Sequence, residues 1–167
     1  MGYKGTTTPT SIRDLWQTPA WLFGYYHQRF NFTTDVAASW FNRFCDDHRS
    51  EKMDALNCGW GERNWCNPPY SHTAEWVDKA ISEMEKGRLT VMLIPGDTAA
   101  HWYHKALAHC TEFHIIRGRI SFVNALTQKA VHGNNKGSTV FVFNPKSFTK
   151  RLPVLVDKTE MQKLGAA

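Results

Sequence analysis

The chain has few cysteines and no long apolar run, and both shortages exclude classes of protein. Its 167 residues include four cysteines, Cys45, Cys58, Cys66 and Cys110, and no two of them form a CxxC pair. A cytosolic chain normally keeps its thiols reduced, which argues against a disulfide scaffold. The spacing of Cys45, His48, Cys58 and Cys66 matches no standard zinc site, so we expect no metal. No apolar stretch approaches the roughly 20 residues that cross a bilayer, and no secretory signal is evident. We therefore expect a cytoplasmic protein that binds no membrane.

Acidic residues are too few to balance the basic ones. Twenty lysines and arginines stand against 15 aspartates and glutamates, which gives a net charge of +5. A basic balance of this kind favours a polyanionic partner, because neutralising phosphates releases counterions and supplies affinity. Charge alone does not establish DNA binding, since many basic proteins bind no nucleic acid.

The order of expected elements predicts an α/β fold. Residues 1–15 are polar and without periodicity, and we expect a flexible lead-in before a single domain over residues 16–167. Thr18 and Pro19 have the character of a helix N-cap and first helical residue. A β-favouring segment covers 30–38, with Asp35 at the carboxyl end of its strand, and further strands are expected at 64–66, 89–94, 113–116 and 139–143. Amphipathic helices are expected after Tyr70 and Asp97. Alternating strands and helices predict a compact, mostly parallel sheet flanked by helices, which binds ligands at the carboxyl ends of its strands.

The motif Asn67-Pro68-Pro69-Tyr70, directly after an expected strand, carries the clearest chemistry. An amine conjugated to an aromatic ring is a poor nucleophile because its lone pair is delocalised. The Asn67 side-chain carbonyl and a backbone carbonyl, for which we favour Pro68, can accept both amine hydrogens and stabilise the charge that develops on nitrogen. Tyr70 offers a flat face for a base that has been flipped out of a duplex. The same four residues also occur as an ordinary proline turn.

Several blocks in order resemble the phage-type DNA N-6-adenine methyltransferase (Dam) family. They are Trp16-Gln17-Thr18-Pro19, the segment 32–38, the segment 65–71, Leu93-Ile94-Pro95 and the segment 117–122. The resemblance spans about Trp16 to Asn144 and implies a Rossmann-like methyltransferase that uses S-adenosylmethionine. It also implies that the protein methylates adenine N6 in DNA, and we expect that DNA to be double-stranded.

The resemblance also assigns expected roles to single residues. Asn67, Pro68, Pro69 and Tyr70 are the expected catalytic loop. The expected cofactor-binding residues are Trp16, Thr18, Pro19, Asp35 and Ala37, with Asp35 binding either the cofactor amine or its ribose hydroxyls. The glycine-rich loop common in such enzymes is missing after Asp35, where Val-Ala-Ala-Ser stands instead. The alternative for Asp35 is a helix cap.

Five further residues are candidates for binding DNA: Ser71, Arg117, Arg119, Phe122 and Lys136. Arginine holds phosphate or recognises guanine with two hydrogen bonds, and Gly118 lets the backbone approach. Phe122 is either a second stacking surface opposite Tyr70 or a core residue of an edge strand. The loop 132–137, which carries Lys136, either becomes ordered on DNA or is an ordinary surface loop.

Two other functions remain open at this point. Loops of the Asn-Pro-Pro-Tyr type also occur in methyltransferases that act on protein glutamine or on RNA. A non-catalytic DNA-binding module with the same fold is the second alternative. We expect no separate target-recognition domain, hence a short or relaxed site, and no obligate protein partner.

Overall fold

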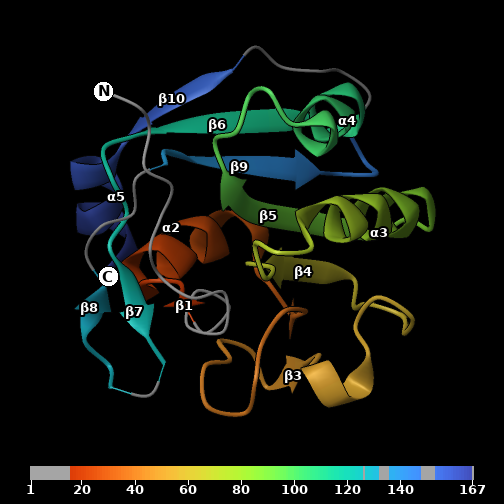
Figure 1. Ribbon diagram of the computed structural model, residues 1–167, viewed down its shortest axis with the longest axis horizontal. Helices are drawn as coiled ribbons and strands as arrows, with labels where there is room; N and C mark the ends of the chain where they lie inside the picture. The colour runs from red at the N-terminus through yellow and green to blue at the C-terminus, as the bar shows by residue number, and fades with distance from the viewer. Residues whose placement is uncertain (1–15, 126, 132–135, 148–152, 167) are drawn as a thin grey trace.

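The computed structural model describes residues 16–125, 127–131, 136–147 and 153–166. The expected lead-in 1–15 and residues 132–135 of the loop discussed above lie outside these ranges. The elements in chain order are β1 (Trp16–Gln17), α2 (Ala20–Phe30), β2 (Thr34–Asp35), β3 (Asp47–His48), the 3-10 helix η1 (Glu51–Met53), β4 (Arg63–Cys66), α3 (Thr73–Glu85), β5 (Leu89–Pro95), α4 (His101–His109), β6 (Glu112–Arg117), β7 (Phe122–Asn124), β8 (Ala130–Val131), β9 (Ser138–Phe143), β10 (Val154–Asp157) and α5 (Lys158–Gly165) (Figure 1).

A seven-stranded sheet forms the centre of the molecule. Its strand order is β10-β6-β9-β5-β4-β2-β3, and every neighbouring pair is parallel except the two that involve β9. The expected α/β fold with a mostly parallel sheet is therefore confirmed. A second sheet of order β1-β7-β8 is small and antiparallel, and it brings residues 16–17 against residues 123–124.

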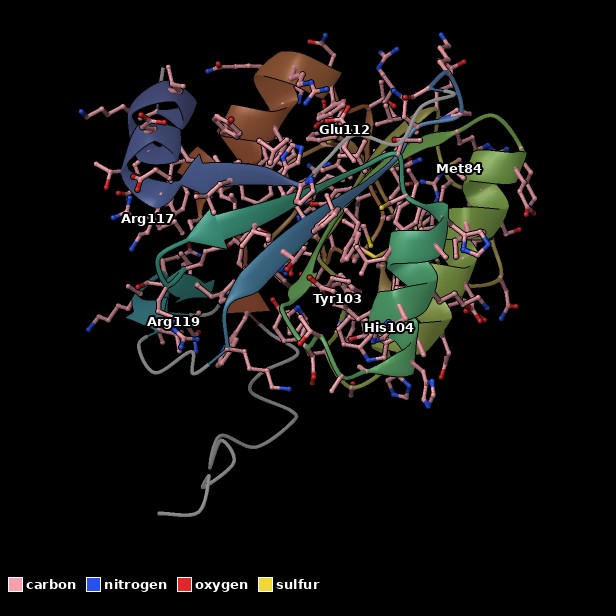
Figure 2. All side chains as sticks on the ribbon, turned by 90° about the horizontal axis from the view of Figure 1, so that it is seen from above. Met84, Tyr103, His104, Glu112, Arg117 and Arg119 are labelled. Carbon is pink, nitrogen blue, oxygen red and sulfur yellow. The ribbon has the colours of Figure 1, made fainter. Side chains whose placement is uncertain are left out.

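Helices cover both faces of the large sheet, with α2 and α5 on one face and α3 and α4 on the other (Figure 2). Successive residues of β5 alternate between these layers. Val91 and Leu93 pack towards α2, whereas Met92 and Ile94 pack towards α3 and α4, and all four are fully buried. A strand buried on both faces is continuously apolar, which explains the run at 89–94.

The start of α2 differs from the prediction by one residue. Pro19, not Thr18, is the N-cap, and its carbonyl accepts hydrogen bonds from the amides of Leu22 and Phe23. No side chain caps the helix, and Thr18 is buried instead. The prediction was wrong because proline's fixed φ suits the extended residue just before a helix as well as the first helical one.

A close contact between α2 and α5 was not expected from the polar sequence after residue 157. A β-carbon built at Gly24 would lie 2.4 Å from the Gly165 carbonyl oxygen, so the two backbones touch. The Asp157 carboxylate caps α5 by accepting from the Thr159 amide at 2.8 Å. Met161 is fully buried beneath α5 in the core shared with α2.

Two kinds of feature are absent from the part of the chain that the structure describes. No helix there is both long and apolar enough to span a bilayer. No three His, Cys, Asp or Glu side chains there gather into a possible metal site, and all four cysteines are free thiols.

Candidate active site

The site lies where the chain reverses its direction across the large sheet. From β2 the chain continues outward to β3, whereas from β4 it continues to β5 on the opposite side of β4. Ligands of open α/β sheets bind in the crevice outside the carboxyl ends of strands at such a switch point. Asp35 is the last residue of β2, and Asn67 directly follows β4. The structure therefore places both residues at the same switch point.

The Asn67 carboxamide is held in one orientation. Its Nδ2 donates a hydrogen bond to the Trp16 backbone carbonyl at 3.2 Å. Because a carbonyl only accepts, the nitrogen of the amide must face Trp16. The Asn67 Oδ1 is buried and has no hydrogen-bond partner among the described residues. Buried polar atoms are nearly always hydrogen-bonded, so an unpartnered acceptor here indicates a place for a donor from outside the chain.

The residues after Asn67 leave a second acceptor. The Pro69 carbonyl accepts from the His72 amide at 3.2 Å, and the Tyr70 carbonyl accepts from the Thr73 hydroxyl at 3.3 Å. The Pro68 carbonyl accepts no hydrogen bond from the described residues. Of the three carbonyls that follow Asn67, that of Pro68 is therefore the one open to a donor from outside the chain, and its catalytic role stays a prediction.

Three aromatic rings meet beside this loop. The Trp16 ring stacks on Phe122 with centroids 5.7 Å apart, and Tyr70 meets the same Phe122 ring edge-on at 6.1 Å. Phe122 is only 1% exposed, so it occupies the core position that was one of its two expected places. The Tyr70 ring is half-buried, and burial raises the pKa of its hydroxyl, which keeps it protonated. The Trp16 Nε1 and the Tyr70 hydroxyl are both buried without partners among the described residues.

Asp35 is buried at the other side of the switch point. Its Oδ2 accepts a hydrogen bond from the Phe44 amide at 3.1 Å, and burial raises the pKa of its carboxyl to about 7. Asp35 caps no helix, because residues 36–46 contain none. Ala37, which is half-buried, follows in a turn.

The DNA-binding candidates lie at several points of the same edge. Arg117 ends β6, and both Arg117 and Arg119 are exposed at one end of the molecule (Figure 2). β6 is three strands from β4, which corresponds to roughly 14 Å at the usual strand spacing. Ser71 is exposed and directly follows Tyr70, the last residue of the expected catalytic loop. Lys136 is exposed and forms an ion pair with Asp97, so its charge is already partly neutralised.

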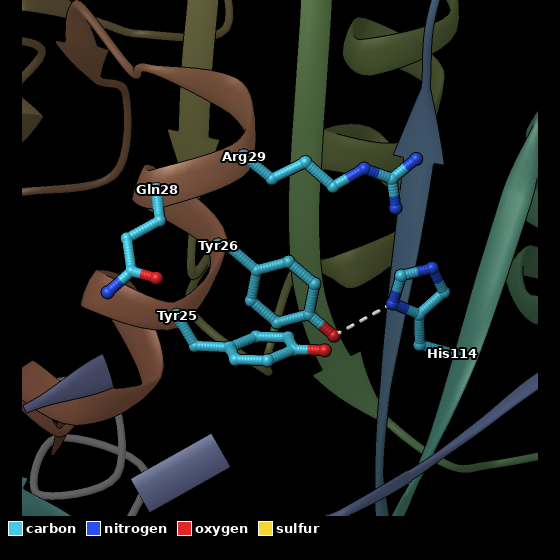
Figure 3. Close-up of a pocket in the computed structure, with 5 residues that line it drawn as sticks. All are labelled: Tyr25, Tyr26, Gln28, Arg29 and His114. Atoms are coloured by element: carbon cyan, nitrogen blue, oxygen red, sulfur yellow. Dashed lines mark hydrogen bonds between the residues drawn. The ribbon is translucent and has the colours of Figure 1, made fainter. Parts of the chain in front are cut away.

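A separate cavity of about 240 Å³ lies between α2 and β6, lined by Tyr25, Tyr26, Gln28, Arg29 and His114 (Figure 3). The Tyr26 hydroxyl and His114 Nδ1 are 3.0 Å apart. Burial raises the pKa of Tyr26, which therefore donates. His114 Nε2 then donates to Glu112 at 3.2 Å, and Arg29 binds both oxygens of Glu112. These polar groups satisfy one another, so this cavity carries no comparable chemistry.

Sequence reasoning missed the turn that connects the two halves of the site. The Gln17 side chain donates to the Asn42 carbonyl at 3.3 Å, and the Asn42 side chain accepts from the amide and hydroxyl of Ser39. The signal was present as a serine three residues before an asparagine, a pattern that favours local side-chain to backbone bonding.

Comparison with known proteins agrees with this geometry. A protein-family profile described as "DNA N-6-adenine-methyltransferase (Dam)" matches residues 5–167. A DNA N-6-adenine-methyltransferase of Escherichia phage T1 is 37% identical over 158 aligned residues, which cover 84% of this chain and 66% of the relative. The enzyme of the same name from Haemophilus phage HP1 is 33% identical over 147 aligned residues, which cover 85% of each chain. The chain therefore belongs to the DNA N-6-adenine-methyltransferase (Dam) family.

Proposed function

We propose that this chain transfers a methyl group from S-adenosylmethionine to N6 of an adenine that has been flipped out of double-stranded DNA. The observation that carries the proposal is the Asn67 Oδ1, a buried acceptor without a partner among the described residues. It lies at the carboxyl end of β4, where such a sheet binds its ligands. Family membership supports the reaction class, and the geometry supports the choice of residues.

The role of the loop follows from the electronic structure of adenine. Its N6 lone pair is delocalised into the ring and is a weak nucleophile. Asn67 Oδ1 and the Pro68 carbonyl accept one N6 hydrogen each, which turns the lone pair towards the methyl donor. Both dipoles become more favourable as positive charge builds on N6, so they stabilise the transition state more than the ground state. The hydrogen bond from Asn67 to Trp16 fixes one acceptor in advance.

The half-buried Tyr70 ring is the proposed stacking surface for the flipped base. An aromatic partner offsets part of the stacking that the base loses when it leaves the duplex. The Phe122 ring supports Tyr70 through their edge-on contact, and the Trp16 ring stacks on Phe122. We retain Phe122 in the DNA site in this supporting role.

The cofactor residues are proposed on the fit of their polar groups. S-adenosylmethionine supplies a methyl group already activated by its sulfonium, so no strong general base is needed. Asp35 holds a carboxylate suited to the amine or ribose hydroxyls of that molecule, and Ala37 leaves space for it. Trp16 offers an indole N–H that has no partner among the described residues. Thr18 and Pro19, both buried, fix Trp16 relative to α2.

The remaining basic edge is proposed to hold the DNA backbone. Contacts to phosphates or bases are proposed for Ser71, Arg117, Arg119 and Lys136, and Lys136 would leave Asp97 to bind a phosphate.

We propose that residues 16–167 act as one methyltransferase domain, without a separate target-recognition domain or an obligate protein partner. Bacterial DNA lies in the cytoplasm, so we expect the enzyme to act there, at a short or relaxed site.

The raised pKa of Asp35 predicts a pH-dependent affinity for the cofactor. With a pKa of about 7 in the free protein, the carboxylate is mostly protonated at pH 6 and half ionised at pH 7. Only the ionised form pairs with an amine or accepts freely from hydroxyls, so affinity for S-adenosylmethionine should rise roughly fivefold from pH 6 to pH 7. Isothermal titration calorimetry at both pH values measures this change. Asp35→Asn should bind weakly with no such rise, and an equal rise in that variant would assign the titration to another group.

The proposed reaction is tested with radiolabelled S-adenosylmethionine and three separate substrates: unmethylated bacterial DNA, RNA and a protein extract. Label should appear in DNA, and digestion of that DNA to nucleosides should recover the label as N6-methyldeoxyadenosine. Label that appears only in protein or only in RNA would replace the proposed substrate. Absence of label from all three would favour a non-catalytic module.

A further inference from the structure

Two adjacent aromatic side chains project from the molecule between β2 and β3. Trp40 is 66% exposed and Phe41 is 78% exposed. Large apolar side chains with this exposure are costly to display in water, and grouped ones commonly mark an interaction surface. We call residues 39–44 the aromatic turn.

Hydrogen bonds from its own side chains stabilise the aromatic turn. The Asn42 Oδ1 accepts from both the amide and the hydroxyl of Ser39, and the Ser39 hydroxyl accepts from the Phe41 amide at 3.3 Å. At its end, Phe44 donates its amide to the Asp35 carboxylate and stacks its ring on Phe23 at 4.4 Å. The two exposed rings therefore project from a fixed base rather than from a loose loop.

Two hydrogen bonds connect the aromatic turn to the catalytic asparagine. Gln17 donates from its side chain to the Asn42 carbonyl, and the neighbouring residue Trp16 accepts from Asn67. The turn, β1 and the catalytic loop thus form one continuous hydrogen-bonded unit at the switch point. The exposed rings lie on the same edge as the place proposed for the flipped adenine.

One cationic side chain, that of Arg43, lies against the Trp40 ring. The Arg43 guanidinium lies 4.2 Å from the ring centroid, and the His48 ring lies 6.0 Å away. Arg43 also forms an ion pair with Asp46 at 3.5 Å, and the Asp46 side chain is fully exposed. Exposed aromatic rings with an arginine beside them suit nucleic acid, because bases stack on aromatic rings and phosphates form ion pairs with the guanidinium.

We propose that the aromatic turn enters the DNA base stack beside the target adenine, with Phe41 as the inserted side chain and Trp40 as its support. This inference rests on the proposed function, because it names how the same site obtains its base. Apolar side chains that insert between base steps unstack them and favour extrusion. Phe41 carries no polar atom and is the more exposed of the pair, whereas Trp40 is braced by Arg43.

The test compares two DNA duplexes built around a target adenine mapped by sequencing of methylated DNA. One duplex is fully paired, and the other has an abasic site opposite the adenine, which lowers the cost of extrusion. Phe41→Ala should methylate the paired duplex roughly 10- to 100-fold more slowly, and the abasic-opposed duplex less than fivefold more slowly. Phe41→Leu should recover most of the rate on the paired duplex. Leu155→Ala, which removes a 69% exposed side chain from the edge strand β10, is the matched control and should change neither rate.

Other outcomes overturn the proposal in distinguishable ways. Equal loss on both duplexes, together with weaker S-adenosylmethionine binding by calorimetry, would make the aromatic turn a cover for the cofactor. A wild-type rate for Phe41→Ala on the paired duplex would remove it from the reaction. If the wild-type protein methylates no DNA, the proposed function fails. Fluorescence anisotropy then tests the aromatic turn by itself. The wild-type protein should bind a duplex that lacks one base more tightly than an intact duplex. The proposed insertion of Phe41 is wrong if Phe41→Ala shows the same difference in affinity.

Discussion

Asn67→Ala should lower the rate constant of methyl transfer by about a thousandfold while affinity for DNA and for S-adenosylmethionine changes only a few-fold. The substitution removes an acceptor that is oriented in advance and that binds more tightly as N6 becomes positive. Loss of one such preorganised dipole typically raises the barrier by about 3–4 kcal/mol. Single-turnover methylation at saturating DNA and cofactor measures the transfer step directly, without a contribution from product release.

The control for this variant is another asparagine. Asn57→Ala removes an exposed side chain that bonds only the nearby Asp54 carboxylate among the described residues, so transfer should proceed at the wild-type rate. A rate for Asn67→Ala within tenfold of wild type would contradict the proposed chemistry. A rate that falls only because DNA binding is lost would instead make Asn67 a DNA contact.

The parts of the site that were predictable are those written in local sequence. The proposed catalytic loop follows a buried strand and precedes an amphipathic helix, and each of these patterns spans only a few neighbouring residues. The continuous apolar run at 89–94 and the stripe that contains Trp76 and Val77 are confirmed as β5 and α3. Period and burial alone determine such elements.

The parts that were not predictable depend on partners far away in the chain. β1 has two residues, and it exists because Trp16 and Gln17 pair with Asn124 and Val123. The orientation of Asn67 likewise depends on a carbonyl 51 positions earlier. No local pattern reports either contact. The aromatic turn was missed for a different reason. Large apolar residues such as Trp40 and Phe41 are expected to be buried, and their sequence does not indicate that they are exposed.

Trp16 is a candidate site residue for two reasons. It lies in one of the sequence blocks that resemble the family, and in the structure its backbone carbonyl orients Asn67 while its ring stacks on Phe122. If Asn67 acts as proposed, methyl transfer depends on the position of β1 and of the helix that follows it.

That dependence makes the contact between α2 and α5 a sensitive point. By helix propensity alone, Gly24→Ala in the middle of α2 should stabilise the protein by up to about 1 kcal/mol. The structure predicts the opposite sign, because the added β-carbon would lie 2.4 Å from the Gly165 carbonyl oxygen and the helices would have to separate. We expect a net loss of about 2–3 kcal/mol, which corresponds to a fall in melting temperature of roughly 4–12 °C for a chain of this size.

Gly137→Ala provides the matched control for thermal unfolding followed by circular dichroism. A β-carbon at Gly137 meets no described atom within 4 Å and Gly137 has no left-handed φ, so its melting temperature should stay close to that of the wild type. Because α2 follows β1 after only Thr18 and Pro19, separation of the helices should also displace Trp16 from Asn67. Gly24→Ala should therefore slow methyl transfer even at temperatures where it remains folded. A variant that is both more stable than wild type and fully active would show that α5 does not press on α2, and that the support of the catalytic asparagine lies elsewhere.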